Sequence, residues 1–280
     1  MDAHSAVYAH FRRLHDEGCF LIPNPWDAGT AVALASLGFP ALATTSAGFS
    51  FSKGLPDSLA VLSVDDALRH ITDIVEAVSL PVNADFQAGY AGDLDEMARN
   101  VTRCVATGVA GLSIEDATGD AQEPLFELSE AAERIAAARS AINESGVDVV
   151  LTGRAECFLY DHPDPLSESI RRLQTYADAG AEVLFAPGIR AREDIATLVD
   201  AVRPFPVNVL MANHTGLTTT DLAQLGVRRI SVGSALSRVT WGAFLNAARE
   251  MLGAGTFQPL AGGASFAELN ELFSSASGPS

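Results

Sequence analysis

The stretch from Val82 to Asp116 reads VNADFQAGYAGDLDEMARNVTRCVATGVAGLSIED and contains one complete unit of a pattern that runs through the chain. Its two apolar ends, Val82 to Asp85 and Gly111 to Glu115, have the length and composition of buried strands, and the residues between them have helical spacing. Thr107 and Gly108 mark the end of that helix, because glycine is common just after a helix C-terminus. A strand, a helix and a strand in this order predict a right-handed unit with two parallel strands.

The same unit recurs on both sides of this stretch, and the chain contains eight such apolar runs. Most are near-continuously hydrophobic, as expected of parallel strands buried on both faces. Eight units over residues 1–252 predict one α/β domain, a closed (β/α)8 TIM-type barrel. An open doubly wound sheet is the alternative, but the first turn, PNPWDAGTA, lacks a glycine-rich dinucleotide fingerprint. The six other strands are predicted at Phe20 to Pro23, Ala41 to Thr44, Val149 to Thr152, Val183 to Ala186, Val207 to Met211 and Arg229 to Val232.

Residues 253–280 depart from this pattern and predict a C-terminal extension. GAGTFQPLAGG has the composition of a loop, SFAELNELF that of a short helix, and SSASGPS that of a disordered end. Phe266, Leu269, Leu272 and Phe273 share one face of the helix. We expect this face to dock on its own barrel or on that of a neighbouring subunit.

Composition excludes several classes of partner. The 280 residues include 18 Lys and Arg against 35 Asp and Glu, a formal net charge of −17, so we expect no nucleic acid and no anionic membrane as partner. No run has membrane-spanning length, and the N-terminus lacks the apolar core of a signal peptide. Three widely spaced cysteines in apolar runs support neither disulfides nor a zinc site, which predicts a reducing, cytoplasmic location.

Charged residues gather at the predicted C-terminal strand ends, where barrels of this kind carry their chemistry. These residues are Asp85, Glu115, Asp116, Glu156 and Arg154. Carboxylates that converge on a barrel mouth repel one another unless they are paired or bind a cation. Oxygen ligands without nearby His or Cys favour Mg²⁺, with Mn²⁺ as the alternative. Arg154 has the planar guanidinium that binds a substrate carboxylate.

Five segments together resemble the isocitrate lyase/phosphoenolpyruvate mutase superfamily in order and spacing, across about residues 15–245. They are LIPNPWDAGTAVALASLGFPALATTSAG, GLPDS, VNADFQAGY, GLSIED and TGRAECF. The resemblance implies a magnesium-dependent (β/α)8 barrel that acts on a small 2-oxo or 2-hydroxy acid. Members break or make a carbon–carbon or phosphorus–carbon bond, often through an enolate. It also implies a homodimer or homotetramer in which a C-terminal helix is exchanged.

The resemblance also implies roles for individual residues. Asp85 corresponds to the principal metal ligand, which also faces the substrate. Glu115 corresponds to a residue that holds metal-bound water, and Asp57 to a loop aspartate near the metal. Arg154 corresponds to the arginine that binds the substrate carboxylate, so Arg154, Asp57 and Glu115 are the catalytic candidates. The segment expected to hold the carboxylate or 2-oxo group consists of Ser46, Ala47 and Gly48.

Two departures from the superfamily pattern bear on the substrate. Gln87 stands where an acidic residue is usual, so we keep it as a metal-ligand candidate that binds more weakly. EDATGDAQEPLFELSE, residues 115–130, contains no Cys, Lys or His, which argues against cleavage of isocitrate or methylisocitrate and against a phosphonate-forming loop. We therefore expect a carbon–carbon lyase, a decarboxylase or an oxaloacetate-hydrolase type of enzyme that acts on a small dicarboxylic acid.

Other interpretations stay open. Asn208 and His214 are further substrate-binding candidates, and His214, in MANHTG, is either a general acid or a solvated loop residue. Of the neighbours Glu115 and Asp116, one is expected to face the mouth and the other, Asp116, to cap the following helix. The alternative functions are phosphonopyruvate or phosphoenolpyruvate phosphorus–carbon chemistry, with phosphate at the NHTG and GSAL turns, and a non-catalytic protein that binds a 2-oxo acid.

Overall fold

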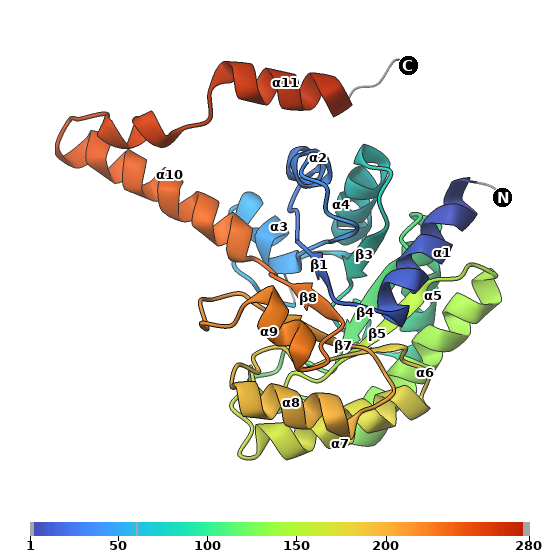
Figure 1. Ribbon diagram of the computed structural model, residues 1–280. Helices are drawn as coiled ribbons and strands as arrows, with labels where there is room; N and C mark the ends of the chain where they lie inside the picture. Colours follow the sequence, from blue (N-terminus) through green and yellow to red (C-terminus); the bar gives the residue numbers. More distant parts are fainter. Residues whose placement is uncertain (1–2, 60, 277–280) are drawn as a thin grey trace.

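Eight parallel strands form one sheet with the order β1-β8-β7-β6-β5-β4-β3-β2, in a computed structural model that describes residues 3–59 and 61–276 (Figure 1). Each strand pairs in parallel with its neighbour, and helices alternate with the strands along the chain. The predicted (β/α)8 barrel is therefore confirmed. The strands are β1 (Phe20–Ile22), β2 (Leu42–Ala43), β3 (Val82–Asp85), β4 (Gly111–Glu115), β5 (Val150–Arg154), β6 (Val183–Phe185), β7 (Val207–Leu210) and β8 (Arg229–Ser231).

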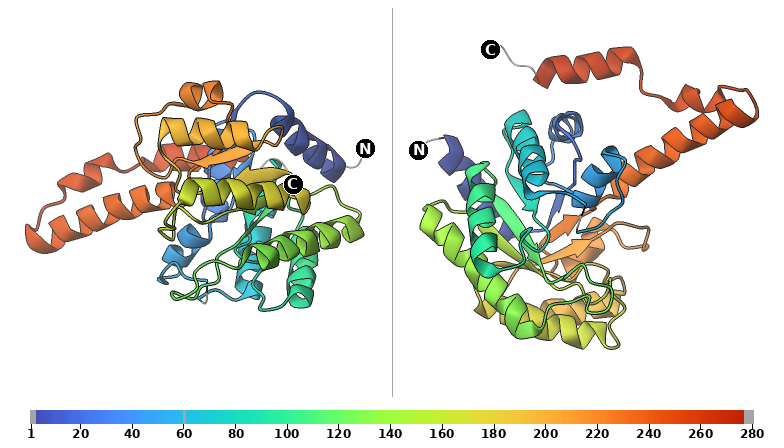
Figure 2. Two further views of the ribbon diagram at one scale, coloured as in Figure 1. Left: turned by 90° about the horizontal axis from the view of Figure 1, so that it is seen from below. Right: turned by 180° about the vertical axis from the view of Figure 1, so that it is seen from behind.

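Most of the helices pack around the strands, and two views show them on the outside of the barrel, whereas the C-terminal helices project away from it (Figure 2). Their starts follow local sequence signals: Asp27, Ser63 and Asp93 each accept a hydrogen bond from a backbone N–H in the first turn of the next helix. The helices are α1 (Ala3–Asp16), α2 (Ala28–Ser36), α3 (Ser46–Ser52), α4 (Val64–Ala77), α5 (Leu94–Ala106), α6 (Leu128–Ser145), α7 (Pro165–Asp178), α8 (Arg192–Ala201), α9 (Thr219–Gln224), α10 (Ala235–Gly253), the short 3₁₀ helix η1 (Gln258–Gly262) and α11 (Phe266–Ala276).

β5 is longer than the sequence indicates. It was expected to end at Thr152, but the ladder continues, because Arg154 pairs with Glu115 of β4 and with Phe185 of β6. A charged residue inside a barrel does not end a strand when its side chain points into a polar interior. Arg154 is therefore held by a rigid strand rather than by a loop.

Asn24 closes the barrel at the seam between β1 and β2, which the strand ladder leaves open among the described residues. There, one backbone hydrogen bond runs from Ala43 N–H to the Pro23 carbonyl at 3.0 Å. The Asn24 amide donates to the Thr44 carbonyl at 2.9 Å. Its oxygen accepts from the N–H of Val232 at 2.9 Å and from the next N–H at 2.8 Å. One buried side chain thus joins three strands.

The interior of the barrel is polar in two layers. Alternate residues of a strand point to the same side, so the layer at the C-terminal ends contains Asp85, Glu115 and Arg154. Most barrels of this type fill their interior with branched aliphatic residues. Here the layer below is polar as well, with Asn83, Ser113, Thr152, Asn208 and Arg229, all buried.

Helix α1 covers the opposite, N-terminal end of the barrel. Phe11 of α1 is fully buried and packs in one cluster with Phe20, Val150 and Val183 at the starts of strands. A Cβ atom on Gly111 would lie 2.7 Å from the Phe11 ring, so the absence of a side chain there lets the ring reach the barrel. The larger core lies between the outer faces of the strands and helices α4 to α8.

The C-terminal extension leaves the barrel along α10, which projects from it (Figure 1). Helix α11 then returns and contacts α2. The expected helix is present and runs to Ala276, so the first three residues of the expected disordered end are helical. The rest of that expected end, residues 277–280, lies outside the described residues. Among the described residues, no helix is long and apolar enough to cross a membrane.

Candidate active site

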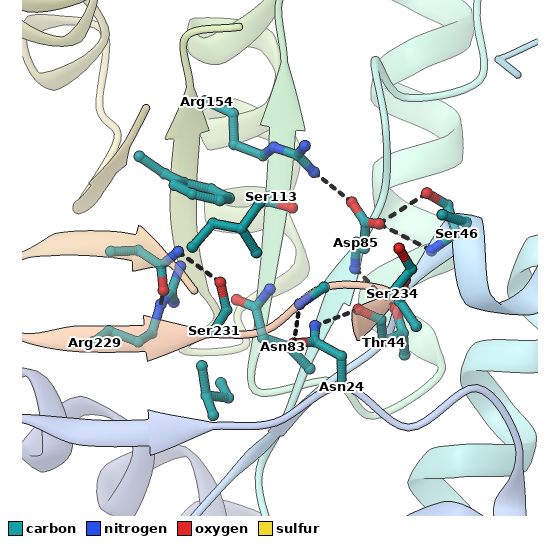
Figure 3. A pocket seen from close by; sticks show the side chains of 18 of the residues that line it. Asn24, Thr44, Ser46, Asn83, Asp85, Ser113, Arg154, Arg229, Ser231 and Ser234 are labelled. Carbon is teal, nitrogen blue, oxygen red and sulfur yellow. Dashed lines mark hydrogen bonds and ion pairs between the residues drawn. The ribbon is translucent and has the colours of Figure 1, made fainter. Parts of the chain in front are cut away.

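A cavity of about 240 Å³ opens at the C-terminal ends of the strands (Figure 3). Strands β1 to β8 and the loops that follow them supply its walls, and these walls are polar from the mouth down into the second layer of the interior. Polar residues that line it are Asn24, Thr44, Thr45, Ser46, Asp57, Asn83, Asp85, Ser113, Arg154, Asn208, Arg229, Ser231 and Ser234.

The guanidinium of Arg154 is surrounded by three carboxylates. Its Nη1 lies 2.6 Å from Oδ1 of Asp85 and 3.0 Å from Oε2 of Glu115. Its Nε donates to Oε1 of Glu156 at 3.0 Å. One positive and three negative charges, if all were ionised, sum to 1 − 3 = −2. We refer to these four residues as the Arg154 cluster.

Burial acts against this excess of negative charge. It raises the pKa of the Glu115 carboxyl well above its usual range, although Arg154 opposes the shift. Burial likewise raises the pKa of Glu156 to about 7, with Arg154 again acting in the other direction. The pKa of Asp57 is raised by burial and then by the charge of Asp85. The site is therefore short of positive charge, which protons or a bound cation can supply.

Asp85 is fixed by residues that come directly after β2. Both the backbone N–H and the hydroxyl of Ser46 donate to Oδ2 of Asp85, each at 2.9 Å. The Asp85 N–H donates to the Thr44 hydroxyl at 2.9 Å. Helix α3 starts here because the Thr45 hydroxyl accepts from the Gly48 N–H. Asp85 thus presents Oδ1 to Arg154 and Oδ2 to Ser46.

The structure brings six of the predicted site residues to the cavity: Ser46, Ala47, Asp57, Asp85, Arg154 and Asn208. Glu115 lies behind the wall and touches the site through Arg154. Gly48 is buried behind Ser46, and a Cβ atom there would lie 2.6 Å from Thr45 Cγ2, so its role is to allow close packing.

Gln87 and His214 do not line the cavity. Gln87 is buried in the turn after β3 with a left-handed φ of 46°, and its carbonyl accepts the Glu115 N–H at 3.0 Å. The structure therefore gives no support to Gln87 as a metal ligand. His214 is exposed in the loop after β7, as its interpretation as a solvated residue requires.

Asp116 does not cap the following helix, which corrects the expectation from sequence. Helix α6 begins only at Leu128, without a side-chain cap. Asp116 instead lies buried behind β4, where it accepts hydrogen bonds from the Glu156 N–H at 2.9 Å, from Arg172 at 2.9 Å and from the Tyr176 hydroxyl at 2.6 Å. It therefore supports the backbone that carries Glu156.

Sequence reasoning named Asn208 but missed the other polar residues deep in the barrel, above all Arg229. Side chains that point to the same face of a strand are two residues apart, and this spacing could have identified them. Asn83 lies two residues before Asp85, and Thr152 two residues before Arg154, so each pair faces the barrel interior. An apolar run interrupted at alternate positions by small polar residues is typical of a strand whose inner face meets a ligand or water.

A divalent cation fits the residues at the mouth. Among the described residues, no three His, Cys, Asp or Glu side chains are grouped so as to hold an ion by themselves. Mg²⁺ needs only one or two protein carboxylates, because water and substrate complete its coordination. Asp85 and Asp57 both line the cavity, and three carboxylates share the single guanidinium of the Arg154 cluster. We take Asp85 and Asp57 as the residues that could hold the ion.

Comparisons with known proteins find relatives over most of the chain. The family model described as phosphoenolpyruvate phosphomutase matches residues 11–252. A 2-methylisocitrate lyase of Escherichia coli (strain K12) is 31% identical over 229 residues, which cover 79% of this chain and 75% of that protein. A crystal structure of a protein from Burkholderia cenocepacia J2315, assigned to the lyases or mutases, superposes with a TM-score of 0.93 at 45% identity, covering 98% of both chains. The structure of an oxaloacetate acetylhydrolase with its product oxalate has a TM-score of 0.84 at 25% identity, covering 96% of this chain and 94% of that one.

Proposed function

Because the chain belongs to the phosphoenolpyruvate phosphomutase family, within the isocitrate lyase/phosphoenolpyruvate mutase superfamily, we propose that it is a magnesium-dependent enzyme that breaks a carbon–carbon bond in a small 2-oxo or 2-hydroxy dicarboxylic acid. The observation that carries this proposal is the Arg154 cluster at the mouth of a small polar cavity. Relatives named as lyase and acetylhydrolase support the reaction class.

The residues of the site have different roles in the proposed reaction. Asp85 and Asp57 hold the ion, and Ser46 fixes the rotamer of Asp85 through two hydrogen bonds. Bound Mg²⁺ supplies Lewis-acid stabilisation of the negative charge that develops as the bond breaks. Arg154 holds Asp85, Glu115 and Glu156 in one geometry, so that they do not move when the substrate enters.

The small volume of the cavity limits the size of the substrate, and apolar residues among the polar lining reduce its exposure to water. About 240 Å³ admits a small acid. Phe185 and Leu159 are among the lining residues, and the guanidinium of Arg154 lies 5.2 Å from the centre of the Phe185 ring. Less water around the charged groups strengthens every electrostatic interaction in the site.

Phosphorus–carbon bond chemistry is the second candidate, because the family model that matches the chain is that of a phosphoenolpyruvate phosphomutase. The loop between β4 and α6 contains no Lys, Arg or His with which to hold a phosphonate. This loop favours the carbon–carbon reaction.

An activity panel tests the proposal. The protein is incubated with oxaloacetate, 2,3-dimethylmalate, 2-methylisocitrate and phosphonopyruvate, in Mg²⁺ or in chelator, and products are identified by mass spectrometry. We expect Mg²⁺-dependent carbon–carbon cleavage of one dicarboxylic acid, and a loss of at least about a hundredfold in kcat/KM for Asp85→Asn. Asp178→Asn, at the exposed end of α7, is the matched control and keeps full activity. Cleavage of phosphonopyruvate alone contradicts the proposal, as does turnover that survives both chelation and Asp85→Asn.

A further inference from the structure

Arg229 is a cation buried at the floor of the cavity without an anionic partner. It is the first residue of β8, is only 3% exposed, and lines the cavity. Its Nε donates to Oδ1 of Asn208 at 2.9 Å and its Nη2 to the Thr152 hydroxyl at 3.0 Å. Its Nη1 lies 3.4 Å from Nε2 of His15. Within the described part of the chain, no carboxylate forms an ion pair with Arg229.

The two arginines of the cavity therefore differ in charge balance. Arg154 has three carboxylates around one guanidinium, whereas Arg229 has two neutral oxygens and an imidazole. Burial and the positive charge of Arg154 lower the pKa of Arg229 to about 9, and burial lowers that of His15 to about 3, so His15 is neutral. An unpaired buried charge is costly, and an apolar side chain would be more favourable here for stability.

The cavity connects the two arginines. Thr152 precedes Arg154 by two residues in β5, so the Arg229 guanidinium that it contacts lies one inward-facing layer below Arg154, roughly 6 to 7 Å along the strand. Neutral polar side chains, Asn83, Ser113 and Ser231, also line this cavity. A ligand that enters past Asp85 can reach Arg229 without crossing an apolar layer.

We propose that Arg229 binds one carboxylate of the substrate at the cavity floor and thereby selects dicarboxylic over monocarboxylic acids. This inference rests on the proposed function and adds the residue that recognises the second anionic group. A diacid whose other end lies at the mouth supplies the counter-ion that Arg229 lacks.

Binding of non-reactive acids tests this without turnover. Succinate, monomethyl succinate and acetate are titrated into the protein by calorimetry, with Mg²⁺ and with chelator. Because charge-assisted hydrogen bonds are strong, we expect wild type to bind succinate at least about tenfold more tightly than its monomethyl ester. Arg229→Gln should weaken succinate binding by about tenfold or more and change ester binding by less than about threefold.

Arg228→Gln is the matched control. It removes the same charge from the neighbouring residue, whose guanidinium donates to the Gly18 carbonyl away from the cavity, and it should leave both affinities unchanged. Arg229→Lys keeps the charge without the planar fork and should recover part of the preference, which covers the case in which Arg229→Gln does not fold.

Two results overturn the inference: a folded Arg229→Gln protein that binds succinate within about twofold of wild type, or a wild type that binds the ester as tightly as succinate. Failure of the proposed function is separable. If no acid of the activity panel is cleaved while succinate binding still depends on Arg229, the carboxylate site at Arg229 is supported and the proposed catalytic function is contradicted.

Discussion

The backbone N–H of Glu156 donates a 2.9 Å hydrogen bond to Oδ1 of Asp116, a carboxylate that lies outside the cavity. The other oxygen of Asp116 accepts from Arg172 and Tyr176. The position of Glu156, and through it that of Arg154, thus depends on a buried ion pair on the outer side of the sheet.

Replacing Asp116 with Asn should therefore destabilise the protein strongly. It removes one partner of a buried ion pair and leaves the Arg172 charge with only Glu168, so we expect the free energy of unfolding to fall by about 3 kcal/mol or more. Tyr176→Phe, which removes a single hydrogen bond from the same carboxylate, should cost about 1 kcal/mol. Urea unfolding measures both, and equal losses for the two variants would contradict the ion-pair argument.

Ser46→Ala should lower activity more than stability. The variant loses the hydroxyl that donates to Asp85 and keeps the backbone N–H that donates to the same oxygen. Removing a hydrogen bond to a charged group costs about 1.5 kcal/mol or more, so we expect kcat/KM to fall by at least about tenfold. Ser52→Ala, in the same helix but bonded only to the Phe49 carbonyl, is the control. Similar kinetics for Ser46→Ala and wild type would show that the backbone N–H alone fixes Asp85.

Asn24→Ala should loosen the barrel seam. The change leaves the Thr44 carbonyl and the Val232 N–H without their side-chain partners, so we expect a loss of about 2 to 3 kcal/mol in the free energy of unfolding. Asn143→Ala, on the exposed side of α6, is a control for the same chemical change. Thermal and urea unfolding report the difference, and a melting temperature equal to that of the control would mean that the backbone hydrogen bond at the seam suffices.

The pH dependence of stability should contain a contribution from His70. Burial lowers the pKa of His70 to about 4, while its Nε2 donates to the Trp26 carbonyl at 3.0 Å and its ring stacks on Phe49. The unfolded chain binds a proton at this residue below about pH 6.5 and the folded chain does not, so stability falls as the pH falls towards 4.

His70→Gln removes this contribution. From about pH 7 to 5.5, wild type should lose about 1 kcal/mol more of its free energy of unfolding than the variant does, as measured by urea titration at both pH values. Carboxylate titrations are common to both proteins and cancel in the difference. If wild type and variant lose equal amounts of unfolding free energy, His70 is solvated in the folded protein and the prediction is wrong.

The end of α10 and the C-terminal extension should carry a subunit interface, as we propose from their exposed apolar side chains. Leu252, Phe257 and Phe266 are 91%, 66% and 89% exposed. We expect a homodimer or homotetramer by light scattering, and the mass of a single 29.3 kDa chain for the double variant Leu252→Glu/Phe266→Glu. Phe205→Glu, before β7, should leave the mass unchanged. A monomeric wild-type protein would contradict this proposal.

The eight strands could be predicted because buried parallel strands read as apolar runs, and Asp85 because a carboxylate at a strand end needs a partner. The C-terminal end of β5 could not be predicted from the sequence. The polar interior that accommodates Arg154 exists only when β4 and β6 pair with β5 in the barrel. The turn at Gln87 was hidden for another reason. A left-handed φ at a residue other than glycine is rare and leaves no mark in the sequence.

Arg229 was not predictable from its own segment. An arginine at the start of a strand is typical of a solvated flank. Here α1, from the far end of the chain, covers that end of the barrel and brings His15 against Arg229. His214 shows the converse: a histidine in a loop after a strand suggests chemistry, yet the loop holds it in solvent.

Helix α1 closes the N-terminal end of the barrel and thereby sets the depth of the cavity. The Phe11 ring is fully buried and packs with Phe20, Val150 and Val183, so apolar side chains close this end of the barrel. Without that ring it would be a tube, wetted from both ends, and water beneath Arg229 would screen the pull of that guanidinium on an anion. An aromatic side chain with no contact to any substrate thus sets how strongly the bottom of the pocket attracts charge, through hydration alone.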